Sequence, residues 1–458
     1  MSHPPTLNSE ISHSPILPLP LSPSPQGARH DFWGYLHLGS DTRFCDSASI
    51  WLDAGSDTRF CGSDSIFRPV AVDVAVALAS RAQIVTRTPL PNAGCVHTGS
   101  LVIFRVSPVR YLGAGVPKNR GAKQMTRKVQ WGVLGVANIG IKKVIPAMQR
   151  GEWSEVRAIA SRDLKKAQQA AELLGIPKAY GSYEELLLDK EVEAVYNPLP
   201  NHLHLPWSIK AAKAGKHVLC EKPIGLSVEE ARTLIEVRDR TGVKIEEAFM
   251  VRTHPQWLTA LSLIKSGRIG AVRAVVGCFS YYNRELANIR NILEYGGGGL
   301  MDIGCYMIYF SRLIFGEEPR RVIGLIDRDR ETRTDILTSA ILDFPLGQSL
   351  FTCSTQLVPY QRVQILGTLG RIEVEIPVNA PPDRPCRILV DSGADLFGGG
   401  VEVIESELCD QYTIQGDAFS RSIRENTEPP IPLESSVATM AVIEAVFRSA
   451  ESDSWERP

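Results

Sequence analysis

The chain has no excess of charge of either sign. Its 458 residues include 50 lysines and arginines against 51 aspartates and glutamates. Proteins that bind nucleic acid or acidic membranes normally carry a basic excess, because their ligands are polyanions. Nucleic acid is therefore not expected as a partner.

Long apolar runs are also absent. The most apolar stretch, residues 70–78, is short and contains Asp73, whereas a membrane-spanning helix needs about 20 apolar residues. The first residues, MSHPPTLNSEISHSP, have neither the positive region nor the continuous apolar stretch of a signal peptide. We therefore expect no membrane association and a cytoplasmic location.

Motifs for metal binding and for nucleophilic hydrolysis are missing as well. The nine cysteines are scattered and form no C-x-x-C pair, and the nine histidines form no H-E-x-x-H motif. Such cysteines are typical of a reduced chain without structural zinc. There is no G-x-S-x-G elbow and no Walker lysine, which argues against α/β-hydrolase and P-loop chemistry. No metal is expected.

The first 124 residues show no pattern of regular secondary structure. They include the proline-rich run LPLPLSPSPQG, and the heptapeptide GSDTRFC occurs twice, from Gly39 and from Gly55. Two short copies are too few for a solenoid, which needs about three repeats to bury a core. We predict that residues 1–124 form a disordered extension. A true start at Met125, and a targeting or docking arm, are the alternative interpretations.

Residues 125–248 alternate between apolar runs and helical spacing. The apolar runs occupy residues 129–135, 156–161, 192–197, 217–221 and 243–249. Between them lie helix signals: Asp163 as an N-cap, Ser-x-x-Glu capping boxes at Ser182 and Ser227, and glycines at 175 and 242 as helix ends. Strands alternating with helices of ten to fifteen residues predict βαβ units and a parallel sheet. We expect an α/β domain, a doubly wound Rossmann sheet.

Residues 249–458 carry a different pattern, in which long β-runs follow one another. The runs lie at 273–282, 320–328, 337–344, 349–355, 362–368 and 371–377, with turn signals such as PLGQ between several of them. This order predicts an α+β domain with an open, largely antiparallel or mixed sheet, covered by helices near 302–315 and 436–450. An open sheet leaves one face for a partner subunit, so we expect a homo-oligomer formed through this sheet.

A dinucleotide-binding motif follows the first strand. The sequence Gly135-Val-Ala137-Asn138-Ile139-Gly140 matches G-x-G-x-x-G with alanine at the middle glycine. Gly135 permits the tight turn, Gly140 lets helix and strand approach, and the helix N-terminus presents amides to a pyrophosphate. Such a turn is by itself a common helix entry, but its place in the first βα unit indicates dinucleotide binding.

The end of the second predicted strand bears on the choice of nicotinamide cofactor. An acidic side chain here accepts the ribose 2′-hydroxyl of NAD, whereas a cation accommodates the 2′-phosphate of NADP. The sequence has Ser161 and Arg162, a hydroxyl and a guanidinium that suit a phosphate. NADP is therefore the expected cofactor. NAD stays the alternative because Asp163 follows directly. In the interpretation without a binding role, Arg162 is a solvated residue at the start of the helix.

A later strand ends at Cys220-Glu221-Lys222-Pro223. Open α/β sheets bind their ligands in the crevice at the carboxyl ends of the strands, so a lysine here is a candidate functional group. A solvated loop lysine is the alternative.

Several stretches together resemble the Gfo/Idh/MocA family of NAD(P)-dependent oxidoreductases, in particular the branch of glucose-fructose oxidoreductase, dimeric dihydrodiol dehydrogenase and NADP-dependent xylose dehydrogenase. The stretches are GVLGVANIG, NPLPNH, HVLCEKP, EAFMVRTHPQ, GGGGLMDIGCY and GTLGRIEVEIP. The resemblance covers about three quarters of the chain. It implies a Rossmann domain followed by an open-sheet domain that closes the active site and often forms the dimer interface. It also implies that Lys222 lies beside the nicotinamide ribose and the substrate hydroxyl, and that further cofactor contacts come from Asn197, Pro198, Asn201, His202 and Glu221.

The stretch from Gly296 to Tyr306 supplies the proposed acid/base. Many family members carry a histidine four residues after the aspartate, whereas this chain has Tyr306 after Asp302. A phenol has a pKa near 10, so we expect Lys222 to favour its deprotonation. Tyr306 is thus the predicted general acid/base, Lys222 its electrostatic partner, and Asp302 an orienting group. In the alternative, Tyr306 is a buried helix residue and Asp302 a helix N-terminal charge.

Five further side chains are weaker candidates. Arg252 and His254 follow the last Rossmann strand, where the resemblance implies groups that face substrate, although His254-Pro255 would also suit a helix start. Arg290 is a second candidate for substrate binding, ranked below Arg252. His204 is expected to be structural, and Tyr309, one helical turn after Tyr306, is better explained by packing.

These observations predict an NADP-dependent oxidoreductase acting on the CH–OH group of a sugar, polyol or cyclic diol. Two alternatives stay open. One is an enzyme that keeps NADP bound and cycles it between two sugars, as glucose-fructose oxidoreductase does. The other is a dinucleotide sensor without catalysis.

Overall fold

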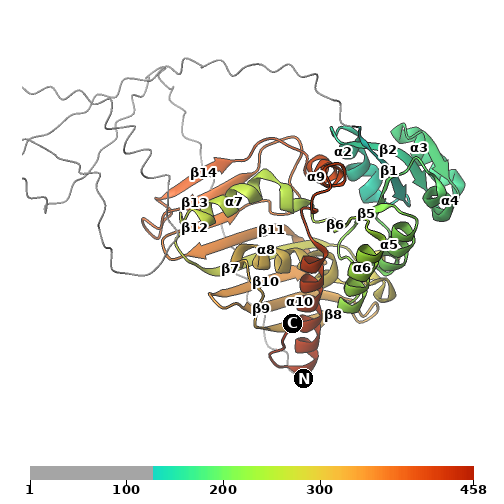
Figure 1. Cartoon of the computed structure of the whole chain (residues 1–458). Helices are drawn as coiled ribbons and strands as arrows, with labels where there is room; N and C mark the ends of the chain where they lie inside the picture. Colours follow the sequence, from blue (N-terminus) through green and yellow to red (C-terminus); the bar gives the residue numbers. More distant parts are fainter. Residues whose placement is uncertain (1–126) are drawn as a thin grey trace, which may run out of the picture. The chain divides into compact units, whose positions relative to one another are not determined.

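Two β-sheets organise residues 127–458, the part of the chain that the computed structural model describes (Figure 1). The predicted N-terminal extension, its repeat and the alternative start at Met125 lie outside the described residues. Within 127–458, no helix is long and apolar enough to cross a membrane.

The first sheet is parallel and has six strands. They are β1 (Val129–Leu134), β2 (Ser154–Ala160), β3 (Lys178–Tyr180), β4 (Ala194–Asn197), β5 (His217–Cys220) and β6 (Ile245–Glu247). Their order in the sheet, β3-β2-β1-β4-β5-β6, is that of doubly wound dinucleotide-binding folds, in which the order reverses beside the first strand. The predicted Rossmann topology is confirmed.

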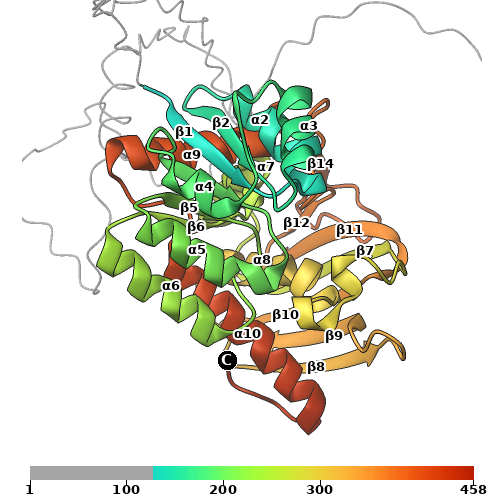
Figure 2. The ribbon, with the colours of Figure 1, turned by 90° about the vertical axis from the view of Figure 1, so that its right-hand side faces the viewer.

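Helices cover both faces of this sheet. They are α2 (Ile145–Gln149, after a π-helical turn Gly140–Val144), α3 (Leu164–Leu174), α4 (Tyr183–Leu188), α5 (His204–Lys213) and α6 (Val228–Thr241). Trp131 and Ile159 are buried in a core with α2 and α3, whereas Ala158 and Val195 are buried in a core with α4, α5 and α6. Figure 2 shows α5 and α6 side by side. Alternate residues of a strand face opposite sides, which is why these strands read as continuous apolar runs.

The predicted helix ends are confirmed. Asp163, Ser182 and Ser227 each accept a hydrogen bond from the backbone N–H three residues later. The glutamates of the two capping boxes reach back one residue beyond the serine: Glu230, for example, accepts from the N–H of Leu226 at 2.7 Å. Gly175 and Gly242 end their helices with φ of 64° and 70°, a conformation that costs glycine little.

The second sheet has eight strands in the order β14-β13-β12-β11-β7-β10-β9-β8. They are β7 (Val272–Tyr282), β8 (Arg321–Arg328), β9 (Asp335–Asp343), β10 (Gln348–Ser354), β11 (Gln356–Gly367), β12 (Arg371–Val374), β13 (Arg387–Asp391) and β14 (Val401–Glu405). β7 and β10 pair in parallel, and the other neighbours pair antiparallel. The predicted open mixed sheet is confirmed. The sequence patterns did not indicate β3, β13 or β14.

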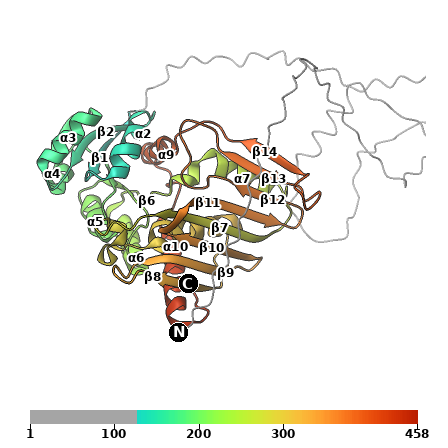
Figure 3. The same cartoon turned by 180° about the vertical axis from the view of Figure 1, so that it is seen from behind.

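Helices α8 (Cys305–Phe315) and α10 (Leu433–Ser452) lie on one face of this sheet (Figure 1). Both had been expected, and α7 (Pro255–Lys265) packs near its β12 and β13 end. The opposite face, turned to the viewer in Figure 3, exposes apolar side chains of the central strands, such as Val276 and Leu350.

Helix α9 (Gln411–Glu425) returns from the C-terminal part of the chain to the first sheet. Ser420 accepts a hydrogen bond from Nε1 of Trp131 at 3.0 Å, and Phe419 packs on the same indole ring. Asp417 accepts from the backbone N–H of Glu152 and Trp153. Along the chain the first sheet ends with β6 at Glu247 and the second begins with β7 at Val272, whereas α9 returns to the first sheet.

Candidate active site

A cavity of about 430 Å³ lies where the carboxyl ends of β4 and β5 meet the second sheet. This volume falls in the usual range for small-molecule sites. Its walls come from the loops after β4 and β5, from β7, from the start of α8 and from α9. The lining includes Ile139, Pro198, Asn201, Glu221, Lys222, Met250, Phe279, Tyr281, Asn283, Arg290, Asp302, Tyr306, Asn379 and Tyr412.

Lys222 and Asp302 form an ion pair inside this cavity, although they are 80 residues apart. The Nζ of Lys222 lies 3.3 Å from Oδ1 of Asp302 and also donates to the backbone carbonyl of Asp302. Lys222 is the second residue after β5, and Asp302 lies in the π-helical turn Leu300–Gly304 before α8. Burial disfavours the charged ammonium, but the adjacent carboxylate outweighs it and raises the pKa of Lys222. The lysine is therefore a fixed cation at neutral pH.

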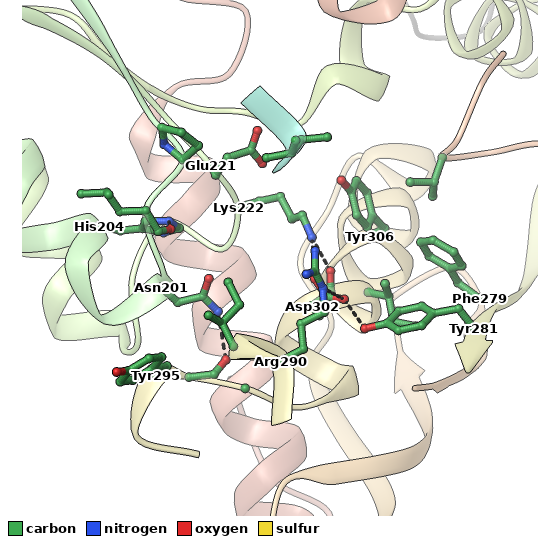
Figure 4. Close-up of a pocket in the computed structure, with 18 of the residues that line it drawn as sticks. Asn201, His204, Glu221, Lys222, Phe279, Tyr281, Arg290, Tyr295, Asp302 and Tyr306 are labelled. Atoms are coloured by element: carbon green, nitrogen blue, oxygen red, sulfur yellow. Dashed lines mark hydrogen bonds and ion pairs between the residues drawn. The ribbon is translucent and has the colours of Figure 1, made fainter. Parts of the chain in front are cut away.

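Asp302 is the centre of a hydrogen-bond network (Figure 4). Its Oδ2 accepts from the hydroxyl of Tyr281 at 2.6 Å and from Nε of Arg290 at 2.9 Å. Burial alone would raise the pKa of Asp302, but Lys222, Arg290 and Tyr281 hold it well below its usual range. Asp302 is thus a carboxylate, which fits the predicted orienting role and gives it no proton to donate.

Tyr306 lies on the first turn of α8 with its ring buried. Phe249 packs edge-on against the ring, with 5.3 Å between ring centroids. The hydroxyl contacts the sulfur of Met250 at 3.5 Å, and a thioether is only a weak acceptor. The Tyr306 hydroxyl is therefore held loosely beside a cavity in which a substrate oxygen would be a better partner.

The expectation that Lys222 favours the phenolate of Tyr306 is not met in this arrangement. The ammonium lies over the ring face, 4.9 Å from the centroid, and its charge is paired with Asp302. Burial raises the pKa of Tyr306 well above its usual value. Tyr306 is accordingly a neutral phenol here, able to donate a proton.

Glu221 lines the same cavity on the side of the first sheet. Its Oε1 accepts a hydrogen bond from the hydroxyl of Tyr196 at 2.6 Å. Burial raises the pKa of Glu221, and the Tyr196 hydrogen bond and the Lys222 charge oppose that rise. Glu221 thus lines the cavity next to Lys222, and its contact with the cofactor stays a prediction.

Arg290, ranked below Arg252 for substrate binding from the sequence, lies closer to the cavity than Arg252 does. Arg290 lines the cavity and pairs with Asp302, and this contact raises its pKa. Arg252 does not line the cavity; its charge acts on the buried Glu246 and on Tyr309 instead. The 3₁₀ turn Met250–Thr253 places Met250, and not Arg252, at the cavity wall, so a substrate contact of Arg252 stays a prediction.

His254 follows the alternative interpretation. Its Nδ1 accepts a hydrogen bond from the N–H of Gln256 and caps α7, with Pro255 at the first helical position. The imidazole is buried. His254 therefore begins a helix and does not reach the cavity.

The glycine turn after β1 has the geometry that a pyrophosphate requires. Gly135 has φ of +97°, and a Cβ there would lie 2.9 Å from Leu199. Both the conformation and the space thus require glycine. The helical segment begins at Asn138, directly after Ala137, and the N–H groups of its first turn have no intrahelical acceptor and are free for a phosphate. The residues present fit a bound dinucleotide.

Gly140 is the last glycine of the motif that begins at Gly135. A Cβ at Gly140 would lie 3.7 Å from Tyr196, an ordinary contact, so close approach does not by itself require glycine at this position. Asn138 and Ile139 lie in the same turn, and Ile139 reaches the cavity wall. The turn therefore joins the cofactor motif to the cavity.

Ser161 and Arg162 lie at the end of β2, as predicted. Ser161 is buried and its Oγ accepts from the N–H of Asp163, whereas Arg162 is exposed. The charge of Arg162 acts on Tyr183 and on His202, and the Tyr183 hydroxyl lies 3.6 Å from where a Cβ at Gly135 would be. Arg162 is thus close to the glycine turn.

Some side chains of the loop after β4 hold the loop in place, and others line the cavity. Asn197 is buried and donates to the carbonyl of His204 and to Ser208, so it holds the loop and does not line the cavity. Asn201 lines the cavity and donates to the carbonyl of Gly296 at 2.9 Å. His202 stacks on Tyr295, with 4.2 Å between centroids. These contacts join the predicted cofactor loop to the segment that carries Arg290.

His204 and Tyr309 have structural contacts, as expected from the sequence. His204 is buried, with each ring nitrogen 2.7 Å from a backbone carbonyl, and burial lowers its pKa to about 4. Tyr309 stacks on Phe249 with 4.4 Å between centroids.

Several lining residues were not singled out from the sequence. Phe279, Tyr281 and Asn283 line the cavity together, and a strand with period two would have placed them on one face. Tyr412 arrives on α9 and Asn379 on an irregular segment, and no local pattern indicates either. Among residues 127–458, no three His, Cys, Asp or Glu side chains are grouped so as to hold a metal ion.

A doubly wound sheet with a glycine turn, joined to a mixed sheet that completes a pocket at its strand ends, defines a two-domain dinucleotide-dependent oxidoreductase. Family models agree. Residues 129–249 match the oxidoreductase family with an NAD-binding Rossmann fold, and residues 257–373 match the GFO/IDH/MocA C-terminal domain. The chain belongs to the Gfo/Idh/MocA family of NAD(P)-dependent oxidoreductases.

Relatives of several activities resemble the chain. An uncharacterised oxidoreductase of Rhizobium meliloti is 48% identical over 72% of this chain and 98% of its own length. The NADP(+)-dependent D-xylose 1-dehydrogenase 2 of Haloferax volcanii is 38% identical over 71% of this chain and 98% of its own. The crystal structure of aldose-aldose oxidoreductase from Caulobacter crescentus, complexed with glycerol, matches with a TM-score of 0.67 and 26% identity, over 72% of this chain and 100% of that one.

Proposed function

We propose that this protein is an NADP-dependent dehydrogenase that interconverts a CH–OH group and a carbonyl on a sugar, polyol or cyclic diol. The observation that carries the proposal is the meeting of Lys222, Asp302 and Tyr306 in one cavity, beside a glycine turn that fits a dinucleotide. A bound nicotinamide supplies or accepts the hydride. The residues of the chain position the substrate and move the proton.

Tyr306 is the proposed acid/base. In carbonyl reduction the substrate carbon gains the hydride, and the substrate oxygen gains the proton of the Tyr306 hydroxyl. The phenolate that remains is stabilised by the Lys222 ammonium over its ring. Alcohol oxidation starts from the phenolate form of Tyr306, whose proton has been released to solvent, and this phenolate accepts the proton of the substrate hydroxyl. Because Asp302 stays ionised, it acts by holding Lys222, Arg290 and Tyr281 in place.

The preference for NADP over NAD is proposed to come from Ser161 and Arg162. Arg162 is exposed at the strand end, close to the glycine turn, and a guanidinium matches phosphate geometry. The activity named for the Haloferax relative supports NADP. Arg162→Ala should lower the preference for NADP over NAD by about tenfold, the cost of one charge-assisted hydrogen bond, when kcat/KM is compared for the two cofactors.

The substrate class is supported by the lining of the cavity. Asn201, Asn283 and Asn379 offer hydrogen bonds, while Phe279 and Ile303 offer an apolar surface. A ring with hydroxyls on its edge and C–H bonds on its face needs both kinds of contact. Acceptance of D-xylose by the Haloferax relative points the same way.

An NADP reduction assay across aldoses, polyols and trans-dihydrodiols tests the proposal, with wild type and Lys222→Met compared side by side. NADPH formation with at least one substrate class, lost in Lys222→Met, is the expected result. Ligand binding with no NADPH formation in wild type would instead favour a dinucleotide sensor.

A second candidate is an enzyme that keeps its cofactor and cycles it between two sugars. The likeness to an aldose-aldose oxidoreductase favours it. Nicotinamide absorbance that stays with the protein through gel filtration would support this cycle, whereas release of the cofactor would favour an ordinary dehydrogenase.

The exposed face of the second sheet is proposed to pair with a second copy of the chain. Apolar side chains are exposed there, among them Val276 on β7, Leu350 on β10 and Leu325 on the edge strand β8, and large exposed apolar patches mark interaction sites. Light scattering should give a dimer mass for the wild type and a lower mass for Leu325→Glu. An unchanged mass in that variant would place the contact elsewhere.

A further inference from the structure

Asp335, at the first position of β9, is a buried carboxylate outside the cavity. Its side chain is not among the lining residues, and the residue is 1% exposed. Its Oδ2 accepts a hydrogen bond from the backbone N–H of Leu300 at 2.6 Å and one from the hydroxyl of Thr338 at 3.2 Å. A buried carboxylate without such partners would be costly. These hydrogen bonds explain why the buried carboxylate of Asp335 is tolerated. The bond to the Leu300 N–H also ties Asp335 to the segment that begins at Leu300.

The glycine run before Leu300 leaves room for this carboxylate. A Cβ at Gly298 would lie 1.9 Å from Oδ1 of Asp335, and Gly298 has φ of +120°. At Gly299 a Cβ would lie 3.4 Å from Oδ2. Gly298 is thus accounted for by the side chain of Asp335 as well as by its backbone conformation, whereas the contact at Gly299 is an ordinary one.

Asp335 binds the backbone N–H of Leu300, and Leu300 begins the helical segment that carries the proposed reaction centre. Leu300 begins the π-helical turn Leu300–Gly304, which contains Asp302 and runs directly into α8 with Tyr306 on its first turn. The N–H of Asp302 also donates to the carbonyl of Gly298 at 3.1 Å. A shift of Leu300 would therefore shift Asp302, and with it the partners of Lys222 and Arg290.

We propose that Asp335 is a positioning residue for the reaction, which fixes the first turn of this helix and thereby places Asp302 and Tyr306 against Lys222. The assignment rests on the proposed function for its effect on turnover. The positioning role requires an acceptor oxygen at the present place of Oδ2 but no negative charge, because the hydrogen bond from Leu300 is donated by a neutral backbone amide.

Three variants separate these requirements. Asp335→Asn keeps the size and an acceptor oxygen, Asp335→Glu keeps the charge but moves the oxygen by one methylene, and Asp335→Ala removes the acceptor. Thr338→Val is the matched control, because it removes the other hydrogen bond of the same carboxylate and leaves Leu300 paired.

The measurements are kcat, KM, the affinity for NADPH by fluorescence, the melting temperature and hydrogen exchange of residues 298–306. We expect Asp335→Asn and Thr338→Val to stay within about threefold of wild-type kcat. Asp335→Glu and Asp335→Ala should lose about 100-fold in kcat, the cost of a misplacement of about 1 Å, with NADPH affinity unchanged. Their exchange should rise in residues 298–306.

Wild-type kcat in Asp335→Ala would overturn the proposal. So would Asp335→Asn as impaired as Asp335→Glu, because a charge or a general loss of stability would then be responsible. If Asp335→Ala does not fold, the Asn and Glu variants decide between position and charge. If the wild type itself lacks dehydrogenase activity, the proposed function fails, while the exchange data still show whether Asp335 fixes the helix.

Discussion

The ammonium of Lys222 lies over the ring of Tyr306, 4.9 Å from its centroid. A cation over an aromatic face is attracted to it, and the attraction grows when the phenol loses its proton. The same ammonium is held by Asp302 at 3.3 Å. Lys222 is therefore placed to compensate charge that appears on Tyr306 during the reaction, rather than to remove its proton beforehand.

Lys222→Met should lower kcat by about 100-fold or more, because an electrostatic group of the reaction centre is lost. Affinity for NADP should stay within about tenfold, the worth of one charged hydrogen bond. Steady-state rates and fluorescence titration measure the two quantities. Lys213→Met, at an exposed lysine of α5, is the control and should behave as wild type. A Lys222→Met enzyme with wild-type kcat would contradict the assignment.

Tyr306→Phe should lose turnover by about 100-fold or more while keeping the fold, because it removes the proton donor and leaves the ring. The hydroxyl contacts only the Met250 sulfur among the described residues, so its loss should cost less than about 1 kcal/mol of unfolding free energy. Tyr309→Phe is the matched control: it is equally buried and stacks on Phe249. Urea denaturation and kcat should separate the two variants, and equal activity in both would remove Tyr306 from the mechanism.

Arg290→Ala should reduce kcat/KM by more than about tenfold, because it removes one of the two cations that pair with Asp302. Arg290→Lys should not restore the rate, since an ammonium cannot reproduce the geometry of the Nε–H bond. Arg252→Ala should stay within about threefold of wild type, as its charge faces Glu246 outside the cavity. The opposite order of the two alanine variants would show that Arg252 is the substrate ligand after all.

Local signals in the sequence were sufficient for the first sheet. Asp163, Ser182, Ser227, Gly175 and Gly242 each act within one helical turn of their own position, so their chemistry is readable without the rest of the chain. The parallel, doubly wound sheet followed from the βαβ rhythm, whereas the order of its strands was not predicted. The short strand β3 had too few residues to show a pattern.

Local patterns gave no long-range relationship; only the family resemblance placed Lys222, Asp302 and Tyr306 in one site. Nothing near Asp302 indicates that Lys222, 80 residues earlier, would neutralise it, or that Arg290 would point inward while Arg252 would not. The pKa of Tyr306 was expected to fall because a lysine was near; the direction reversed because burial outweighs a cation whose charge is already paired. Such outcomes depend on how the two sheets meet, which no window of sequence contains.

Glu247 offers a test of the core beneath the cavity. It is the last residue of β6 and 1% exposed, and its Oε1 accepts from the N–H of Ile224 at 2.8 Å, two residues after Lys222. Burial raises its pKa from 4.5 to about 7, with Ser436, the Ile224 amide, Arg312 and Lys222 opposing the rise. The folded chain therefore keeps a proton there between pH 4.5 and about 7 that the unfolded chain has released.

Glu247→Gln should remove this pH dependence and leave the contact with Ile224 in place, because the amide oxygen still accepts a hydrogen bond. The wild type should lose stability relative to the variant as pH rises from 4.5 to about 7, since the folded state binds the extra proton over that range. By pH values above about 7 the difference should reach about 3 kcal/mol, at 1.36 kcal/mol for each unit of pKa. Urea denaturation of both proteins across this range measures it, with Glu229→Gln, at an exposed position of α6, as a control that should follow the wild type. Parallel stability curves for wild type and Glu247→Gln would mean that Glu247 titrates alike in the folded and unfolded chain, and the carboxyl would then have to be solvated despite its place under the Lys222 loop.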